Sequence, residues 1–157
     1  MSALNEALNN QRTGDRFCSA VHLRLSPTVT GVEVVLANGG HPPALVLRHD
    51  GRVEAVDQEP GLLLGLFEET GIDQRLRLDP GDAIVLYTDG VIEAREPSTG
   101  EQYGQERFEA LLARFAGRTA NGIARRLELA VIDHQDGGAL DDVAVVVIRA
   151  DPRAGSS

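Results

Sequence analysis

The segment from residue 79 to residue 95 constrains the fold of this chain more than any other part of the sequence. It begins with Asp-Pro-Gly-Asp at positions 79–82, where proline fixes φ and the glycine after it tolerates φ > 0. This order is the one that a type II turn requires. Ala83 to Tyr87 is then a continuous apolar run of strand length, which is typical of a strand covered on both faces. We therefore expect an interior strand that starts at this turn.

A carboxylate and a glycine follow the expected strand. Asp89 would be held at the end of a rigid element, and Gly90 would let backbone or a ligand approach closely. This combination predicts that Asp89 is a metal ligand with Gly90 beside it. The alternative is that Asp89-Gly90 is only a turn after a strand, and the dipeptide alone does not separate the two interpretations.

Length and composition indicate one globular domain. The chain has 157 residues, of which 42% are hydrophobic and 25% are charged. No apolar run approaches the roughly 20 residues that span a bilayer, and the N-terminus lacks the basic and then apolar progression of a signal peptide. A lone Cys18 allows no internal disulfide, as in a reducing compartment. We therefore expect a cytoplasmic protein without a membrane partner.

The charge balance argues against nucleic acid as a partner. The net charge is −9, from 24 acidic and 15 basic residues, and no cluster of basic residues stands out. The same acidic surplus repels any phosphorylated substrate unless bound divalent cations reverse the sign at the site.

The rest of the pattern predicts a sheet-rich α+β domain. Strands alternate with tight turns in the first half of the chain, and helical periodicity appears only later. Two late helices are expected to cover one face of a mostly antiparallel sheet. The expected elements are a helix over about 2–10, strands over 16–25, 32–37 and 72–78, a hairpin with strands 44–47 and 52–56 around Asp50-Gly51, helices over 108–115 and after Thr119, and an interior strand over 143–148. Residues 26–31, which begin with Ser-Pro, are expected to turn the chain, and Asp50-Gly51 is the preferred pair for a two-residue hairpin loop. Residues 151–157 are expected to form a disordered tail.

Two further carboxylates, Asp141 and Asp142, stand directly before the last expected strand. If that strand is the antiparallel neighbour of 83–87, its start lies beside the end of the other strand, and these carboxylates converge with Asp89. Clustered aspartate oxygens suit Mg²⁺ or Mn²⁺. The alternative is that Asp141-Asp142 is a solvated turn or a capping pair, and spacing alone leaves both open.

Six motifs occur in an order that resembles a known family. The chain is similar to the sporulation and stress-regulator phosphatases, a bacterial branch of the PP2C-like metal-dependent protein phosphatases, over nearly its whole length. Each motif is weak alone, but six in order are specific. They are Ala-Asn-Gly-Gly-His-Pro-Pro-Ala-Leu-Val-Leu-Arg at 37–48, Asp-Gly at 50–51, Leu-Gly at 64–65, Leu-Asp-Pro-Gly-Asp through Glu-Ala-Arg at 78–95, Tyr-Gly-Gln-Glu-Arg-Phe at 103–108 and Leu-Asp-Asp-Val-Ala at 140–144.

The resemblance implies a fold, a cofactor and a substrate class. The fold would be a PP2C-like β-sandwich flanked by helices, with two Mn²⁺ or Mg²⁺ ions at one end. Asp89 matches the metal ligand of the family's Thr-Asp-Gly motif, Asp141 matches that of its Asp-Asp motif, and Asp142 is the neighbour in that motif. The substrate would be a phosphoserine or phosphothreonine on a small regulatory protein, typically an anti-sigma-factor antagonist. A metal-activated water would hydrolyse it without a covalent intermediate.

The chain departs from the family pattern at its front. Family members carry Gly-Asp and Gly-His-Gly motifs there, and an aspartate of these motifs bridges the two metals, but nothing before Phe17 supplies them. We therefore expect residues 1–150 to be the C-terminal portion of a PP2C-like domain. Strands missing from a sandwich expose edges and core, which predicts a homodimer, strand exchange or poor solubility. The alternative function is a catalytically inactive truncated phosphatase that acts as a binding or regulatory module.

Overall fold

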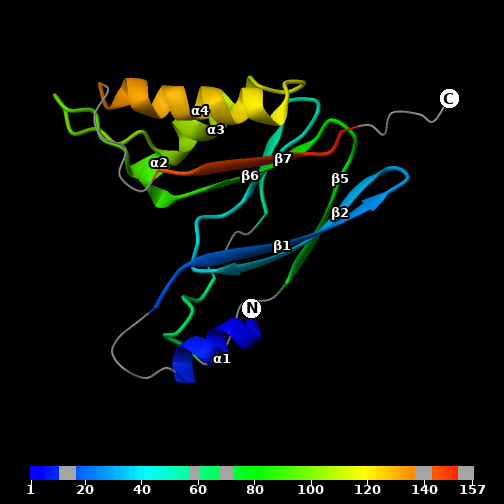
Figure 1. The fold of residues 1–157 in the computed structure, drawn as a ribbon. Coiled ribbons are helices and arrows are strands. Elements are labelled where there is room, and N and C mark those ends of the chain that lie inside the picture. Colours follow the sequence, from blue (N-terminus) through cyan, green and yellow to red (C-terminus); the bar gives the residue numbers. More distant parts are fainter. Residues whose placement is uncertain (11–16, 57–60, 68–72, 137–142, 152–157) are drawn as a thin grey trace.

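Two antiparallel sheets lie face to face at the centre of the protein (Figure 1). The computed structural model describes residues 1–10, 17–56, 61–67, 73–136 and 143–151. One sheet has the strand order β1-β2-β5 and the other has the order β4-β3-β6-β7. The elements are α1 (Ser2–Asn10), β1 (Ala20–Thr28), β2 (Gly31–Gly39), β3 (Leu45–Leu47), β4 (Val53–Ala55), β5 (Gln74–Leu78), β6 (Ala83–Tyr87), α2 (Asp89–Glu93), α3 (Gln105–Ala113), α4 (Ala120–His134) and β7 (Val145–Arg149).

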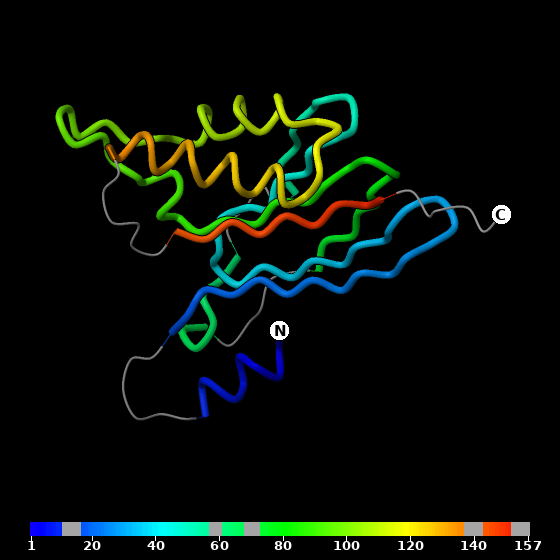
Figure 2. The backbone as a smooth tube through the Cα atoms, turned by 45° about the horizontal axis from the view of Figure 1, so that its top comes forward, coloured from blue at the N-terminus to red at the C-terminus, as the bar shows by residue number. Residues whose placement is uncertain are grey.

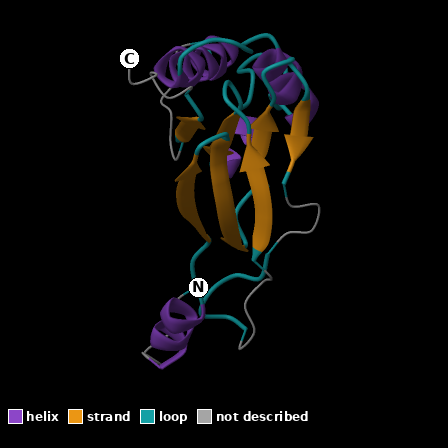
Figure 3. Ribbon diagram, turned by 90° about the vertical axis from the view of Figure 1, so that its right-hand side faces the viewer, coloured by secondary structure: helices purple, strands orange, loops and turns teal. Residues whose placement is uncertain are grey.

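Helices flank this pair of sheets. In Figures 1 and 3, α3 and α4 lie over the sheet that contains β6 and β7, whereas α1 lies on the far side, beyond β1 and β2. Figure 2 shows β6 and β7 side by side beneath α4. One apolar core fills the space between the helices and the four-stranded sheet, and a second fills the space between the two sheets. The α+β sandwich that the sequence predicts is therefore confirmed.

The turn and interior strand predicted over residues 79–87 are also confirmed. The N–H of Asp82 donates to the carbonyl of Asp79 at 2.9 Å, and Gly81 has φ of 99°, as a type II turn requires. β6 then pairs with β3 on one side and with β7 on the other. The first three residues of β6 are buried because both faces of the strand are covered.

The late helices form where the sequence predicts them. The Oγ1 atom of Thr119 accepts a hydrogen bond from the N–H of Gly122 at 3.2 Å, so Thr119 caps α4. Ile123, Leu127 and Val131 form the buried stripe of this helix. These side chains pack on the four-stranded sheet and fix the helical layer.

Two turn predictions are wrong in detail. The turn expected over residues 26–31 exists but is shorter, at residues 29–30, because β1 continues to Thr28. Pro27 is tolerated in this strand because β1 pairs only with β2 among the described strands, so one edge makes no ladder hydrogen bonds. The Asp50-Gly51 hairpin exists, but Arg48 pairs with Arg52, so the loop has three residues rather than two, with Gly51 at φ of 92°.

The last strand does not lie in the sheet interior as the sequence predicts. Within the described ranges, β7 pairs with β6 alone and is an edge strand. Its apolar sequence has another cause: Val145 and Val147 pack against the helical core, whereas Ile148 packs against the core between the sheets. Val146 is left 51% exposed. Of the tail predicted over residues 151–157, Asp151 is described and forms an ion pair with Arg149, whereas residues 152–157 lie outside the described residues. No helix in the described ranges is long and apolar enough to cross a membrane.

Candidate metal centre

Asp89 is the first residue of α2, directly after β6 and Thr88. Thr88 is extended, with φ of −81° and ψ of 158°, and the chain then turns into one short helix. The side chain of Asp89 is exposed, and its Oδ1 atom accepts a hydrogen bond from the N–H of Gly90 at 2.9 Å. A short helix rather than a simple turn therefore follows the strand, and the metal-ligand role of Asp89 stays a prediction. Gly90 is helical rather than a site of unusual φ.

Thr88 joins the end of β6 to the segment that leads into β7. Its N–H donates to the carbonyl of Ala144 at 3.1 Å, and its Oγ1 atom accepts from the N–H of Ala144 at 2.9 Å. These bonds extend the β6–β7 ladder by one step beyond the pairing of Tyr87 with Val145. As a result, the chain just before β7 lies beside the chain just before Asp89. This contact joins residues 56 positions apart, so the sequence alone does not reveal the role of Thr88.

Tyr87 holds the end of β6 against the helical layer. Its ring packs on Phe108 with the centroids 4.6 Å apart, and its hydroxyl donates to Oε1 of Gln105 at 2.8 Å. Gln105 in turn donates to Oε1 of Glu109 at 2.6 Å. Burial raises the pKa of Tyr87, and the hydrogen bond with Gln105 offsets part of that shift. The backbone beneath Asp89 is therefore anchored by a buried aromatic side chain.

A cavity of about 280 Å³ opens between the two sheets next to Thr88. Its walls are mainly apolar, and its polar side chains include Ser19 and His41, whose Oγ and Nδ1 atoms are 3.4 Å apart. The turn that carries His41 is clamped by buried Asn38, which donates to the His41 carbonyl at 2.9 Å and accepts from its N–H at 2.8 Å. His41 therefore lies in a structural corner beside the candidate site, and Ser19 is a neighbour that the sequence did not reveal.

The described residues supply one predicted metal ligand, Asp89. Asp141 and Asp142 lie outside the described residues, although Val143 and Ala144 directly follow them in the chain. The described ranges contain no group of three or more His, Cys, Asp or Glu side chains that could hold a metal ion. The three other histidines are also dispersed: His22 is exposed on β1, His49 bonds to Asp82, and His134 bonds to the carbonyl of Glu101.

The donor chemistry at Asp89 fits a hard divalent cation. An exposed carboxylate at the start of α2, one residue after the end of β6, offers an oxygen ligand of the kind that Mg²⁺ and Mn²⁺ prefer. Oδ1 is engaged by one N–H, and Oδ2 makes no hydrogen bond within the described ranges. Two more carboxylates stand in the sequence directly before Val143, whose neighbour Ala144 is bonded to Thr88.

A family model decides the relationship of this chain to known proteins. The model of the stage II sporulation protein E (SpoIIE) family matches residues 1–151. The chain belongs to the SpoIIE family. The predicted resemblance to PP2C-like phosphatases of the sporulation and stress-regulator type is therefore confirmed.

Individual relatives agree with this SpoIIE-family assignment. Protein IcfG of Synechocystis sp. is 32% identical over 116 residues, which are 71% of this chain and 17% of IcfG. The structure of the RsbU and RsbW domains of Rv1364c from Mycobacterium tuberculosis matches with a TM-score of 0.76 and 25% identity, over 94% of this chain and 40% of that chain. The phosphatase domain of SpoIIE from Bacillus subtilis has the same fold, with a TM-score of 0.67 and 18% identity, over 97% of this chain and 66% of that domain.

Proposed function

We propose that this SpoIIE-family chain is part of a Mn²⁺- or Mg²⁺-dependent protein phosphatase whose metal ligands include Asp89, Asp141 and Asp142. The observation that carries the proposal is the pair of hydrogen bonds between Thr88 and Ala144. They hold the strand that precedes Asp89 against the segment that follows Asp141-Asp142 in the chain. Family membership supports the reaction class.

The residues of this chain would bind the cation and orient the substrate phosphate. Asp89, Asp141 and Asp142 offer the oxygen ligands, and Gly90 adds no side chain beside them. When bound, divalent cations neutralise phosphoryl oxygens and lower the pKa of water enough for it to attack phosphorus. The cation charge is needed because the chain itself carries −9 and would otherwise repel a phosphate.

The substrate in this proposal is phosphoserine or phosphothreonine on a small regulatory protein. The family assignment and the likeness to the RsbU domain of Rv1364c support a regulatory phosphoprotein of the anti-sigma-factor-antagonist type. The exposed position of Asp89 is compatible with a protein substrate, because a phosphorylated side chain on a folded partner can reach it without entering a deep cleft.

The test is hydrolysis of p-nitrophenyl phosphate and of a phosphoserine peptide by the whole chain, with Mn²⁺ and with chelator. The proposal expects turnover that requires the cation and is abolished in Asp89→Asn. The matched control is Asp133→Asn, an exposed aspartate on α4, which should leave turnover unchanged. Cation binding without hydrolysis of either substrate would instead favour the inactive regulatory module.

The open side of the sandwich supports a homodimer. β1 and β7 are both edge strands within the described ranges, and Leu25 and Val146 remain 38% and 51% exposed there. β7 itself contains no proline, and its only charged residue is Arg149. Antiparallel pairing of β7 with β7 of a second copy about a two-fold axis would cover this edge.

A further inference from the structure

The outer face of the three-stranded sheet carries two arginines that make no ion pair or hydrogen bond with another described side chain. Alternation along the strands places Val34 and Leu76 in the core between the sheets, so Val35 and Arg75 face the other way. Arg24 of β1 and Arg75 of β5 are both the cross-strand neighbours of Val35. Three strands thus present the row Arg24, Val35, Arg75.

Neither arginine of this row is neutralised by the described part of the chain. Arg24 and Arg75 are exposed, and no ion pair or hydrogen bond to another described side chain involves them. The adjacent Arg77 differs, because its Nε atom lies 3.1 Å from Asp79 and it donates to the carbonyl of Thr30 at 2.9 Å. Glu33 is the cross-strand neighbour of Arg77, one row away from Arg24 and Arg75. The row itself is therefore cationic.

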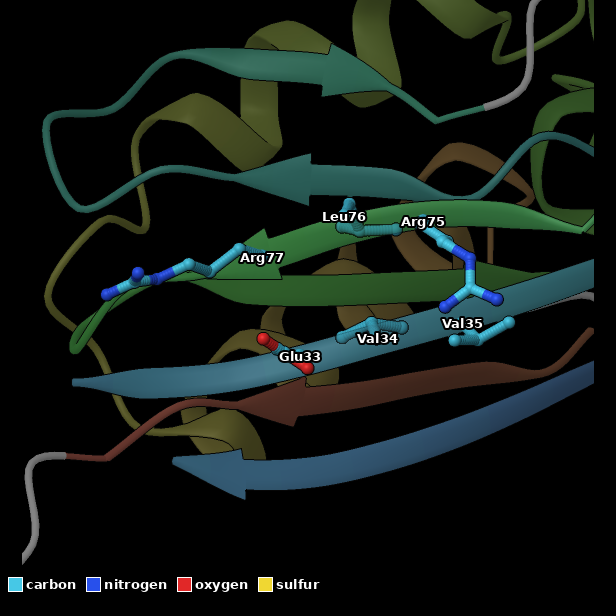
Figure 4. Close-up of a pocket in the computed structure, with 6 residues that line it drawn as sticks. All are labelled: Glu33, Val34, Val35, Arg75, Leu76 and Arg77. Carbon is cyan, nitrogen blue, oxygen red and sulfur yellow. The ribbon is translucent and has the colours of Figure 1, made fainter. Parts of the chain in front are cut away.

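This face is also hollowed. A shallow groove of about 390 Å³ runs between β2 and β5 and is lined by Glu33, Val34, Val35, Arg75, Leu76 and Arg77 (Figure 4). The acidic residue of this lining, Glu33, is the cross-strand neighbour of Arg77. In Figure 4, the side chain of Arg75 extends from β5 towards Val35 of β2, whereas Arg77 points away from it. Val35 is half-buried and gives the groove an apolar floor. Arg75 lines the groove, and Arg24 lies beside it on β1, on the other side of Val35. Guanidinium groups on the two sides of an apolar residue fit a ligand with carboxylates and an apolar side chain between them.

We propose that the groove between β2 and β5, with Arg24, Val35 and Arg75, is a docking surface for an acidic segment of a partner protein. Charge complementarity supports this occupant, since the row is cationic and each arginine can bind a carboxylate. The net charge of −9 favours a short acidic segment over a long polyanion such as nucleic acid. A long polyanion would extend beyond the arginine row and be repelled by the acidic residues elsewhere on the surface. The proposal does not depend on phosphatase activity.

The experiment measures binding of the whole chain to a fluorescent peptide that repeats Glu-Ala-Glu-Leu, with a Gln-Ala-Gln-Leu peptide as the uncharged comparison. We expect saturable binding of the glutamate peptide that weakens with salt. Arg24→Gln and Arg75→Gln should each weaken it by up to about fivefold, the range for one exposed ion pair. Amide signals of Val35 and Arg75 should shift during the titration. Both variants are at exposed positions, so they should keep the fold.

The matched control is Arg125→Gln, an exposed arginine on α4 without a partner among the described residues. It makes the same change in net charge and should bind the glutamate peptide as the unmodified chain does. Equal loss in Arg125→Gln, equal affinity for the glutamine peptide, or no binding of the glutamate peptide would overturn the proposal. Binding of a single-stranded oligonucleotide of the same charge with equal affinity would overturn it as well, because the face would then not select an acidic protein segment.

Discussion

Thr88 and Ala144 hold each other through two hydrogen bonds, one from the Thr88 N–H at 3.1 Å and one to the Thr88 hydroxyl at 2.9 Å. These bonds continue the β6–β7 hydrogen-bond ladder by one residue, between the end of β6 and the start of α2. The hydroxyl is therefore not used to cap α2. A residue between a strand and a predicted metal ligand thus connects two segments that are far apart in sequence.

Replacing Thr88 with valine should destabilise the protein by about 1 kcal/mol, because the N–H of Ala144 loses its acceptor while the side-chain shape is kept. Thr88→Ser is the control, since it retains the hydroxyl. Denaturant unfolding of both variants checks the prediction. Equal stability of the valine variant and the unmodified chain would show that the hydroxyl does not hold the two segments together.

Asp82 should make the protein sensitive to acid. Its side chain is 1% exposed. Burial raises its pKa, but hydrogen bonds from the His49 N–H, the Arg48 guanidinium and the Asp79 N–H outweigh burial, and the net pKa lies below the ordinary value of 3.8. Because the folded pKa is lowered, the stabilisation by this carboxylate is complete above pH 3.8 and is lost as pH falls through the folded pKa.

Asp82→Asn should therefore cost about 2 kcal/mol at neutral pH and flatten the loss of stability in acid. Unfolding by denaturant, repeated from neutral pH down to acid, measures both effects. Asp79→Asn is the control, because Asp79 is exposed on the same turn and its ion pair with Arg77 is open to solvent. An unchanged pH profile in Asp82→Asn would contradict the assignment.

Val146→Lys should prevent self-association without unfolding the chain. Val146 is 51% exposed on the β7 edge, so a lysine there costs little in the monomer but places like charges together when two β7 strands pair. Light scattering should report a dimer for the unmodified chain and a monomer for the variant. Leu129→Lys, at an exposed position on α4, should remain dimeric. A monomeric unmodified chain would contradict the homodimer.

Tyr87→Phe should lower the free energy of unfolding by about 1 kcal/mol at most. The variant keeps the packing on Phe108 and loses only the hydrogen bond to Gln105, which retains its bond to Glu109. Thermal unfolding measures this loss. A much larger effect would mean that the hydroxyl, rather than the ring, anchors the end of β6.

Local patterns in the sequence predicted the elements well because each pattern has a local cause. The proline-glycine turn before β6, the threonine cap of α4 and the apolar stripe of that helix all depend on residues close together in the chain. The edge position of β7 could not be predicted in this way. An apolar strand sequence indicates that both faces of the strand are covered. It does not indicate whether the strand pairs with one or two neighbours in the sheet.

The candidate site was predictable only in part for a similar reason. The position of Asp89 just after a strand follows from the sequence. The expectation that this strand and the last strand are antiparallel neighbours is confirmed by the pairing of β6 with β7. The contributions of Thr88 and Ser19 depend on contacts across 56 and 22 residues, which no spacing rule reveals. The buried bonds of Asp82 to residues of the β3–β4 loop were hidden for the same reason.

A Mn²⁺ titration of the isotope-labelled chain, followed by paramagnetic broadening of its amide signals, tests the metal site most directly. If Asp89 is a metal ligand, the signals of Asp89, Gly90 and Ala144 should broaden first, and binding should weaken at least about tenfold in Asp89→Asn but not in Asp133→Asn. Broadening that begins elsewhere, or that is the same in Asp89→Asn, would contradict a metal centre at the end of β6.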